Sequence, residues 1–310
     1  MPADDSETVE YADIEAAMER LDDPTVVKHT PVERSTSLEE MTGAADVQLK
    51  LEQLQWTGSF KTRGAYNKIK RCLEDGDVGQ VIAASAGNHA QGVALAATKL
   101  GVVATIVMPR NAPQAKIDAT RGYGATVELV GQDFQAAMRH AKDLAAGSSA
   151  EFVHAFDDPD IVAGQGTLGV EMAADVPDAD TVVVPIGGGG LISGIATAME
   201  AAVDRDVRVV GVQPEGALHA KPSIERDEIV ELSDVDTVAE GIADTRLLER
   251  TWAVLRERVD EVVAVSDREL AVAVTLLAER AKIVSEAAGA APVAALLGDD
   301  LDVEGEHVAA

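Results

Sequence analysis

The sequence predicts an α/β fold built on a mostly parallel, twisted sheet flanked by helices. Short Val/Ile/Ala-rich runs alternate with longer amphipathic stretches, the order that a parallel sheet with crossover helices requires. Runs such as Thr181–Ile186 are almost wholly apolar, which indicates burial on both faces. The predicted strands are Val47–Leu51, Val81–Ala84, Val103–Met108, Thr126–Leu129, Thr181–Ile186, Val207–Val212 and Val262–Val265. The predicted helices include Ala12–Leu21, Gly64–Leu73, His89–Leu100, Phe134–Ala146, Ile192–Ala202 and Asp267–Lys282.

Length and charge limit what the protein can be. With 310 residues, 46% of them hydrophobic, the chain can form one large α/β domain or two lobes with separate cores. Its formal net charge of −28 repels nucleic-acid phosphates and acidic lipid headgroups, so neither is an expected partner. The acidic residues are spread along the chain, which indicates a solvated surface. Either the composition drifted acidic for solubility, or the protein is halophilic and works in concentrated salt, where screening weakens the repulsion.

The sequence also favours a soluble, cytoplasmic protein. The single cysteine, Cys72, excludes an internal disulfide and a multi-thiolate metal site, and we expect it to be a buried structural thiol. The first residues show no signal peptide. Residues 181–199 carry no charge, but Pro185 and four consecutive glycines would break a membrane-spanning helix.

Four consecutive glycines, Gly187–Gly190, follow the predicted strand Thr181–Ile186 and precede a helix. In open α/β sheets, ligands bind where strands end and helices begin, and backbone N–H groups in such a turn can surround an anion. The spacing is neither Gly-x-Gly-x-x-Gly nor that of a P-loop, which argues against those nucleotide sites. The turn therefore predicts a phosphate site; the alternative is a tight turn without a ligand.

Lys61 lies between a Thr57-Gly-Ser turn and a predicted helix, with the aromatic Phe60 beside it. A lone lysine is usually a solvated surface group. In a partly apolar pocket near other cations, however, its ammonium form is disfavoured, and a neutral amine can form an imine with an aldehyde.

A third junction, Ser85-Ala-Gly-Asn-His89, directly follows the predicted strand Val81–Ala84. Ser85, Asn88 and the backbone N–H groups at a helix start would make a site for an anion of carboxylate size. The alternative is an ordinary capped helix. His89 could be a general base, but it has no visible partner in the sequence and is expected to orient the loop.

Together these segments resemble the threonine/serine dehydratase branch of the pyridoxal 5′-phosphate (PLP) enzymes with the tryptophan synthase β-subunit fold, fold type II. The likeness covers about residue 12 to the C-terminus and rests on four ordered motifs: Thr57–Ala65, Ser85–Ala90, Gly187–Leu191 and Glu286–Ala290. It implies two lobes, each with a mostly parallel sheet. Residues 1–75 and 156–310 would form the large lobe, and 76–155 a small lobe inserted in it, with the cofactor between them.

The resemblance also implies a role for each site residue. Lys61 would bind the cofactor aldehyde, and Phe60 and Gly241 would contact the two faces of its ring. Asn88 would bond the ring hydroxyl, and Glu286 would lie near the ring nitrogen. The substrate carboxylate would be bound by Ser85, Asn88 and His89, and the cofactor phosphate by Gly187, Gly188, Gly189, Gly190 and Leu191.

The implied activity is elimination of water from threonine, giving 2-oxobutanoate and ammonia, and from serine, giving pyruvate. Lys61 would remove the α-proton and the cofactor would take up the electron pair. Amino-acid metabolism, including isoleucine biosynthesis, is the expected context, and a homodimer or higher homo-oligomer is the default expectation.

Several positions depart from the family pattern. Serine racemases of this branch typically have a second serine where this chain has Ala86, so elimination should dominate over racemisation. The divalent-cation site of some relatives uses acids where this chain has Gln213 and near His219, so no divalent metal is expected. In relatives a strand like His307–Ala310 continues to a Ser-Gly-Gly-Asn turn whose serine bonds the pyridine nitrogen, and the sequence stops before such a turn.

Two other interpretations stay open from the sequence. One is a PLP enzyme of neighbouring specificity: a serine racemase, a hydroxyaspartate dehydratase or a β-replacement enzyme. The other is a non-catalytic amino-acid-binding or nucleotide-binding homologue, because a fold alone does not fix an activity.

Overall fold

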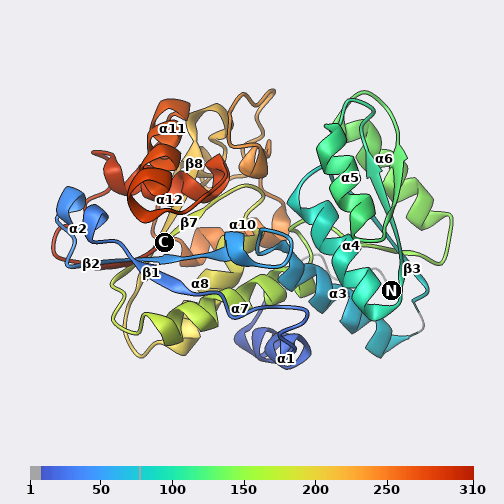
Figure 1. Cartoon of the computed structure of the whole chain (residues 1–310), viewed down its shortest axis with the longest axis horizontal. Helices are drawn as coiled ribbons and strands as arrows, with labels where there is room; N and C mark the ends of the chain where they lie inside the picture. Colours follow the sequence, from blue (N-terminus) through green and yellow to red (C-terminus); the bar gives the residue numbers. More distant parts are fainter. Residues whose placement is uncertain (1–7, 77) are drawn as a thin grey trace.

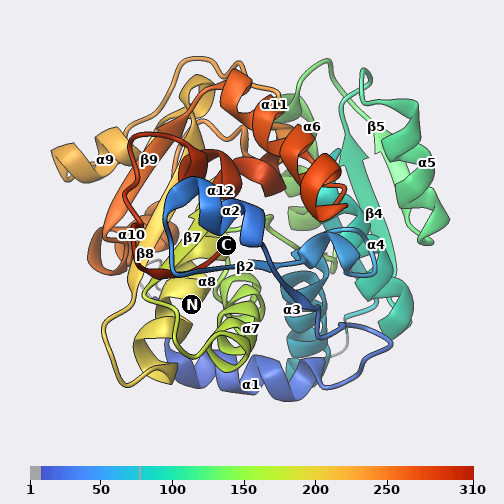
Figure 2. The same cartoon turned by 60° about the vertical axis from the view of Figure 1, so that its left-hand side comes forward.

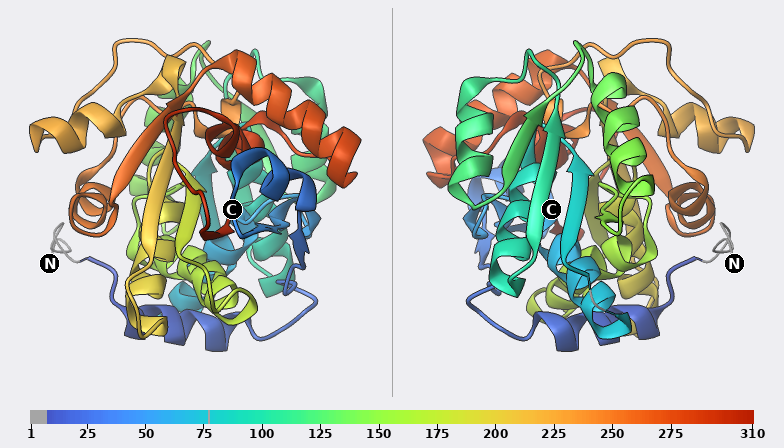
Figure 3. Two further views of the ribbon diagram at one scale, coloured as in Figure 1. Left: turned by 90° about the vertical axis from the view of Figure 1, so that its left-hand side faces the viewer. Right: turned by 90° about the vertical axis from the view of Figure 1, so that its right-hand side faces the viewer.

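The computed structural model describes residues 8–76 and 78–310, and its strands form two separate sheets (Figure 1). The larger sheet has six strands in the order β1-β2-β10-β7-β8-β9, and only the β1–β2 pair is antiparallel. Its strands are β1 (Val32–Arg34), β2 (Asp46–Lys50), β7 (Thr181–Pro185), β8 (Arg208–Pro214), β9 (Glu261–Val265) and β10 (His307–Ala309). The C-terminal strand β10 lies between β2 and β7, well inside the molecule (Figure 3).

The smaller sheet is fully parallel, with the order β5-β4-β3-β6. Its strands are β3 (Gln80–Ala84), β4 (Val103–Met108), β5 (Thr126–Leu129) and β6 (Glu151–Phe152). Helices α4 (Asn88–Leu100), α5 (Gln114–Gly122) and α6 (Phe134–Ala146) pack around it (Figure 3, right). This sheet is therefore drawn from residues 80–152, and all other strands belong to the larger sheet.

Helices cover both faces of the larger sheet. One face carries α11 (Asp267–Leu276) and α12 (Ala287–Leu297), and the other carries α7 (Pro159–Asp175) and α8 (Gly190–Ala202) (Figure 2). The remaining helices are α1 (Tyr11–Leu21), α2 (Thr36–Thr42), α3 (Lys61–Asp75), α9 (Ala220–Arg226), α10 (Glu249–Arg258), the 3₁₀ turns η1 (Glu52–Leu54), η2 (Glu215–Ala217) and η3 (Glu240–Ile242), and the π turn η4 (Leu277–Ala281).

Local sequence explains where helices begin. The Asp158 side chain caps α7 by accepting from the N–H groups of Asp160 and Ile161, and Pro159 occupies the first turn, where its missing N–H costs nothing. Ser266 and Glu269 form a capping box at α11. These caps fix the residues at which α7 and α11 begin.

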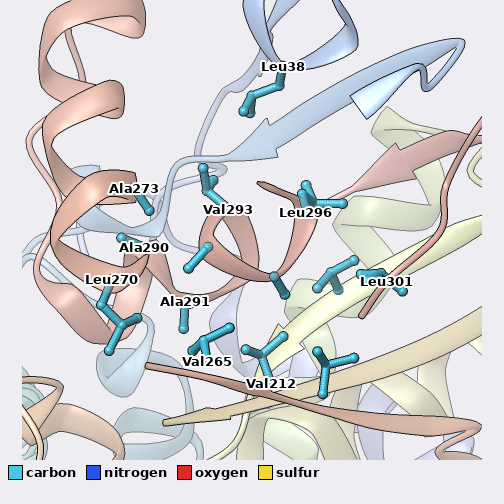
Figure 4. Close-up of a cluster of buried hydrophobic side chains, with 14 of the residues drawn as sticks. Leu38, Val212, Val265, Leu270, Ala273, Ala290, Ala291, Val293, Leu296 and Leu301 are labelled. Carbon is cyan, nitrogen blue, oxygen red and sulfur yellow. The ribbon is translucent and has the colours of Figure 1, made fainter. Parts of the chain in front are cut away.

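Two apolar cores form on the larger sheet, and two more form on the smaller one. Ala290, Ala291 and Val293 of α12 pack on Val212 and Val265 of the sheet (Figure 4). Small residues let α7 approach its neighbours: a Cβ on Gly164 would lie 2.6 Å from the Gly64 Cα, and one on Gly194 would lie 2.5 Å from the Gly166 nitrogen. The close contact fixes α3, which carries Lys61, against the main core.

The sequence located all seven predicted strands, but it missed the short β1 and β6. The predicted helix Asp267–Lys282 is α-helical to Leu276 and continues directly as the π turn η4 to Ala281. Cys72 is half-buried and not fully buried as expected, and its burial raises the thiol pKa to about 11. None of the helices in the described ranges, 8–76 and 78–310, is both long and apolar enough to cross a membrane.

Candidate active site

A cavity of about 860 Å³ lies between the two sheets. This volume falls within the range of about 300–1,000 Å³ that small-molecule and cofactor sites occupy. All the site residues that the sequence predicted line it: Phe60, Lys61, Ser85, Asn88, His89, Gly187, Gly188, Gly189, Gly190, Leu191, Gly241 and Glu286. Segments as far apart in the sequence as Phe60 and Glu286 therefore meet in one cavity.

Lys61 is the first residue of α3, and its side chain extends into the cavity. Its Nζ donates to the Ala155 carbonyl at 2.9 Å and lies 5.2 Å from the centre of the Phe60 ring. Burial lowers the pKa of the Lys61 amine, and the Asp244 carboxylate partly opposes this effect. The neighbouring charge is thus an anion and not the other cations that the sequence suggested, and burial is what disfavours the ammonium form.

The tetraglycine turn, Gly187–Gly190, connects β7 to α8 and is tightly packed. A Cβ on Gly188 would lie 2.4 Å from the Phe156 ring, and one on Gly190 would lie 2.9 Å from the Phe156 Cβ. Gly189 has a φ of +88°, which side chains rarely adopt. Larger residues are therefore excluded at this turn by neighbours and conformation. Backbone N–H groups at a helix start such as that of α8 can bind an anion.

Asp244 follows η3 and was not predicted from the sequence, although it lines the same cavity. Its Oδ2 is 2.7 Å from the point where a Cβ on Gly187 would be. Burial raises the pKa of the Asp244 carboxyl, while Lys61 and the backbone N–H of Gly188 oppose the rise. A half-buried carboxyl therefore lies beside the tetraglycine turn, where the charge of Lys61 acts on it.

The Ser85–His89 turn connects β3 to α4. The Ser85 hydroxyl accepts from the Gly87 N–H at 3.1 Å, which shapes the turn at the N-terminus of α4. The His89 ring lies with its Nε2 3.1 Å from the Val153 carbonyl, and burial lowers its pKa to about 3. The His89 ring is therefore neutral and engaged with the Val153 carbonyl, and its role in orienting the turn stays a prediction.

Asn88 and Glu286 meet across the cavity, with the Asn88 Nδ2 donating to Glu286 Oε1 at 2.8 Å. A Cβ on Gly241 would lie 3.2 Å from the same Glu286 oxygen. The three residues come from α4, η3 and the start of α12, so one hydrogen bond joins elements of both sheets. Asn88 is expected to bond the ring hydroxyl of the cofactor and Glu286 to lie near the ring nitrogen. These two side chains contact each other directly in the structure.

Arg63, two residues after Lys61, is another functional position that the sequence did not reveal. Its guanidinium is 1% exposed and forms ion pairs with Glu52 at 2.8 Å and Glu171 at 2.7 Å. Burial raises the pKa of Glu171, but hydrogen bonds from Arg63 and Lys50 outweigh it, so the pKa lies below its usual range. This network holds the start of α3 and with it the Lys61 backbone.

His219 supports the tetraglycine turn from behind. Gln213 accepts from the Ala220 N–H through Oε1, so its amide nitrogen donates to His219 Nε2 at 3.0 Å. The proton of the neutral ring is then on Nδ1, and burial lowers the His219 pKa to about 4, with the Gly187 backbone opposing the shift. No cluster of three or more His, Cys, Asp or Glu residues suited to a metal occurs in the described parts of the chain.

The residues present fit an aldehyde cofactor that carries a phosphate. A lysine with a disfavoured charge and a glycine turn open to an anion share one cavity, and the buried Ser59 hydroxyl, also at its wall, has no hydrogen-bond partner among the described residues. Lys61 would hold the aldehyde and Gly187–Leu191 the phosphate. The fold and the site together define a PLP-dependent enzyme of fold type II.

The chain belongs to the family of pyridoxal-phosphate dependent enzymes, whose family model matches residues 25–310. It is 48% identical over 284 residues to an L-threonine ammonia-lyase of Thermotoga maritima, covering 92% of this chain and 70% of that protein. Among solved structures, a threonine deaminase from T.th. is 39% identical with a TM-score of 0.90, covering 97% of this chain and 96% of that one. A maize serine racemase is 33% identical with a TM-score of 0.92, covering 98% and 92%.

Proposed function

We propose that the chain is a PLP-dependent ammonia-lyase that converts threonine to 2-oxobutanoate and ammonia and also acts on serine, giving pyruvate. The observation that carries this proposal is a single cavity that joins an amine of lowered pKa, Lys61, to the tetraglycine turn. The similarity to proteins named threonine ammonia-lyase and threonine deaminase supports the choice of substrate.

Lys61 performs the proton transfer in this proposal. PLP, when bound, supplies an electron sink for the pair left behind when the α-proton is removed. Once the substrate amine has displaced it, the neutral Lys61 amine accepts the α-proton of the substrate. The Ala155 carbonyl, 2.9 Å from Nζ, holds the amine in the cavity before and after the transfer. The β-hydroxyl would leave as water with the proton that Lys61 has taken up, and hydrolysis of the product would give the 2-oxo acid and ammonia.

The Ser85–His89 turn is proposed to bind the substrate carboxylate. The Ser85 hydroxyl, the Asn88 amide and backbone N–H groups at the start of α4 are all at the cavity wall. Because Nε2 of His89 is engaged with the Val153 carbonyl, His89 would contribute its backbone N–H and not its ring. Phe60 and Gly241 are proposed to contact the cofactor ring, and the contacting pair Asn88 and Glu286 its polar edge.

Racemisation is the competing activity, because the fold also matches a serine racemase. A racemase must return a proton to the face of the substrate opposite Lys61. Ala86 lies at the cavity wall in the turn that binds the substrate, and it has no proton to give. This residue favours elimination over racemisation.

The test is to incubate the purified protein with L-threonine, L-serine and hydroxyaspartate and to measure keto acid and D-amino acid separately. The proposal expects keto acid from threonine and serine as the main product. The matched variant Ala86→Ser should raise the yield of D-serine relative to pyruvate. D-serine as the main product of the unmodified chain, or no keto acid from threonine, would contradict it.

Further proposals concern the lobes, the assembly, the location and the metabolic role of the protein. We propose lobe boundaries at 1–75 with 156–310 and at 76–155, a homodimer or higher homo-oligomer, a cytoplasmic location and a role in amino-acid metabolism that includes isoleucine biosynthesis. The net charge of −28 supports a halophilic protein. Unfolding measured from low to molar salt tests that last point, because a halophilic chain gains stability as salt screens its surface.

A further inference from the structure

The Asp244 carboxyl places an acidic group next to the turn that is proposed to bind the negatively charged phosphate. Its Oδ2 is 2.7 Å from the Cβ position of Gly187, and the Gly188 N–H interacts with its carboxylate. The carboxyl therefore uses one of the N–H groups that a phosphate in the tetraglycine turn would also approach.

Lys61 is the charged group that faces Asp244, from the start of α3. On the other elements around the turn, charged groups are directed elsewhere. Asp157 accepts from the Thr251 N–H at the start of α10, and Arg250 acts on Asp157. The His154 ring accepts from the backbone N–H of Asp157. Among the described residues, Lys61 is the cation whose charge acts on the Asp244 carboxyl.

Binding of the cofactor would bring new negative charge to this turn. Lys61, whose ammonium form burial already disfavours, would hold the aldehyde, and the phosphate would lie at the turn that Asp244 contacts. A carboxylate and a phosphate held at the same partly buried turn would repel each other, which favours the protonated form of the carboxyl. A carboxylic acid becomes a hydrogen-bond donor, and a phosphate oxygen is a strong acceptor.

We infer that Asp244 takes up a proton when a phosphate-bearing cofactor enters the tetraglycine turn, and that it binds the phosphate as a neutral acid by donating that proton. This inference rests on the proposed function, because it needs the cofactor in this cavity. Asp244 is then a positioning residue for the phosphate, and it fills the place of the basic side chain that the turn lacks. It also makes cofactor affinity depend on pH: affinity falls as pH rises and the acid can no longer stay protonated.

The experiment compares the full-length protein with Asp244→Asn, which keeps the shape of the side chain but cannot ionise. Dissociation constants for PLP and for pyridoxal, which lacks the phosphate, are measured between about pH 6 and 9 after removal of the cofactor. Lys61 reacts with both ligands, so the ratio of the two constants isolates the phosphate. Glu240→Gln serves as the control, because Glu240 lines the same cavity but is exposed and paired with Lys116. A ³¹P NMR titration of the holoenzyme gives a second measure of the phosphate environment.

In the unmodified chain and in Glu240→Gln, PLP should bind more tightly than pyridoxal at low pH. The ratio of the pyridoxal to the PLP dissociation constant should fall by up to about tenfold for each unit that the pH rises, which is the limit for one proton. In Asp244→Asn, the total fall of this ratio over the whole pH range should be smaller by at least about tenfold. The pH dependence of the ³¹P chemical shift should also differ from that of the unmodified chain. Equal pH dependence in Asp244→Asn and the unmodified chain would overturn the inference. If Asp244→Asn does not fold, Asp244→Ser gives the same comparison. Failure of the proposed function is distinguishable, because PLP would then not bind Lys61 at all or threonine would not be deaminated.

Discussion

The tetraglycine turn after β7 and the Ser85–His89 turn after β3 both bring a helix N-terminus to the cavity, yet their surroundings differ. Around Gly188 the Phe156 ring leaves no space for a single added carbon, whereas a Cβ on Gly87 would meet nothing within 4 Å. Each turn is supported by a buried neutral histidine, His219 and His89 respectively. The first turn is thus shaped completely by protein neighbours, and the second keeps room for a ligand. This difference matches a permanently bound cofactor on one side and a substrate that enters and leaves on the other.

The largest effect is expected for Gly188→Ala. The added Cβ would lie 2.4 Å from the Phe156 ring, so the turn or the ring must move. Overpacking of this kind lowers stability by about 1–3 kcal/mol, and displaced N–H groups should weaken PLP binding as well. Denaturant unfolding and PLP titration measure both effects. The double variant Gly188→Ala/Phe156→Ala should lose less than the two single variants added together; simple additivity would show that the ring is not the obstacle.

Acid should destabilise both turns through their histidines. Burial holds the pKa of His89 at about 3 and that of His219 at about 4, below the usual value for histidine. The unfolded chain binds protons at these positions as pH falls below about 6.5, while the folded chain does not. Stability therefore decreases as pH falls from about 6.5 toward 4, by at most about 1.4 kcal/mol per pH unit for each histidine. Denaturant unfolding across this window checks the trend. His89→Gln should make it shallower, and an unchanged slope would contradict the neutral, buried state of His89.

The smallest effect on stability is expected for Gly87→Ala. Its φ of −127° is accessible to alanine, and the new Cβ has open space, so the free energy of unfolding should change by less than about 0.5 kcal/mol. Because that space is the proposed substrate site, KM for threonine should rise by about tenfold while PLP affinity stays the same. A loss of PLP affinity equal to that of Gly188→Ala would erase the distinction between the two turns.

The sequence predicted the elements whose physical signal is local. β7 and the centre of β8 are runs rich in valine, and they are buried on both faces as such runs require. The tetraglycine turn is visible because so many consecutive glycines have few structural uses. The strands β1 and β6 are only 3 and 2 residues long, and so short a segment has no periodicity to detect.

The contacts that complete the site are long-range and could not be predicted in this way. Asn88 and Glu286 are 198 positions apart, and their hydrogen bond depends on how the two sheets pack. Asp244 is one of 54 acidic residues, and nothing near it in sequence separates it from those on the surface. Arg63 is likewise buried only because Glu52 and Glu171 come from other elements to neutralise it.

The most direct measurement is to reduce the purified protein with borohydride in the presence of PLP and to map the modified peptide by mass spectrometry. Three lysines line the cavity, but Lys50 is paired with Glu171 and Lys116 with Glu240. Lys61 forms no ion pair within the described residues, and burial lowers its pKa, so it is the amine that should react. The account predicts a single adduct on the peptide that contains Lys61, lost in Lys61→Ala. An adduct on Lys50 or Lys116, or no adduct, would contradict it.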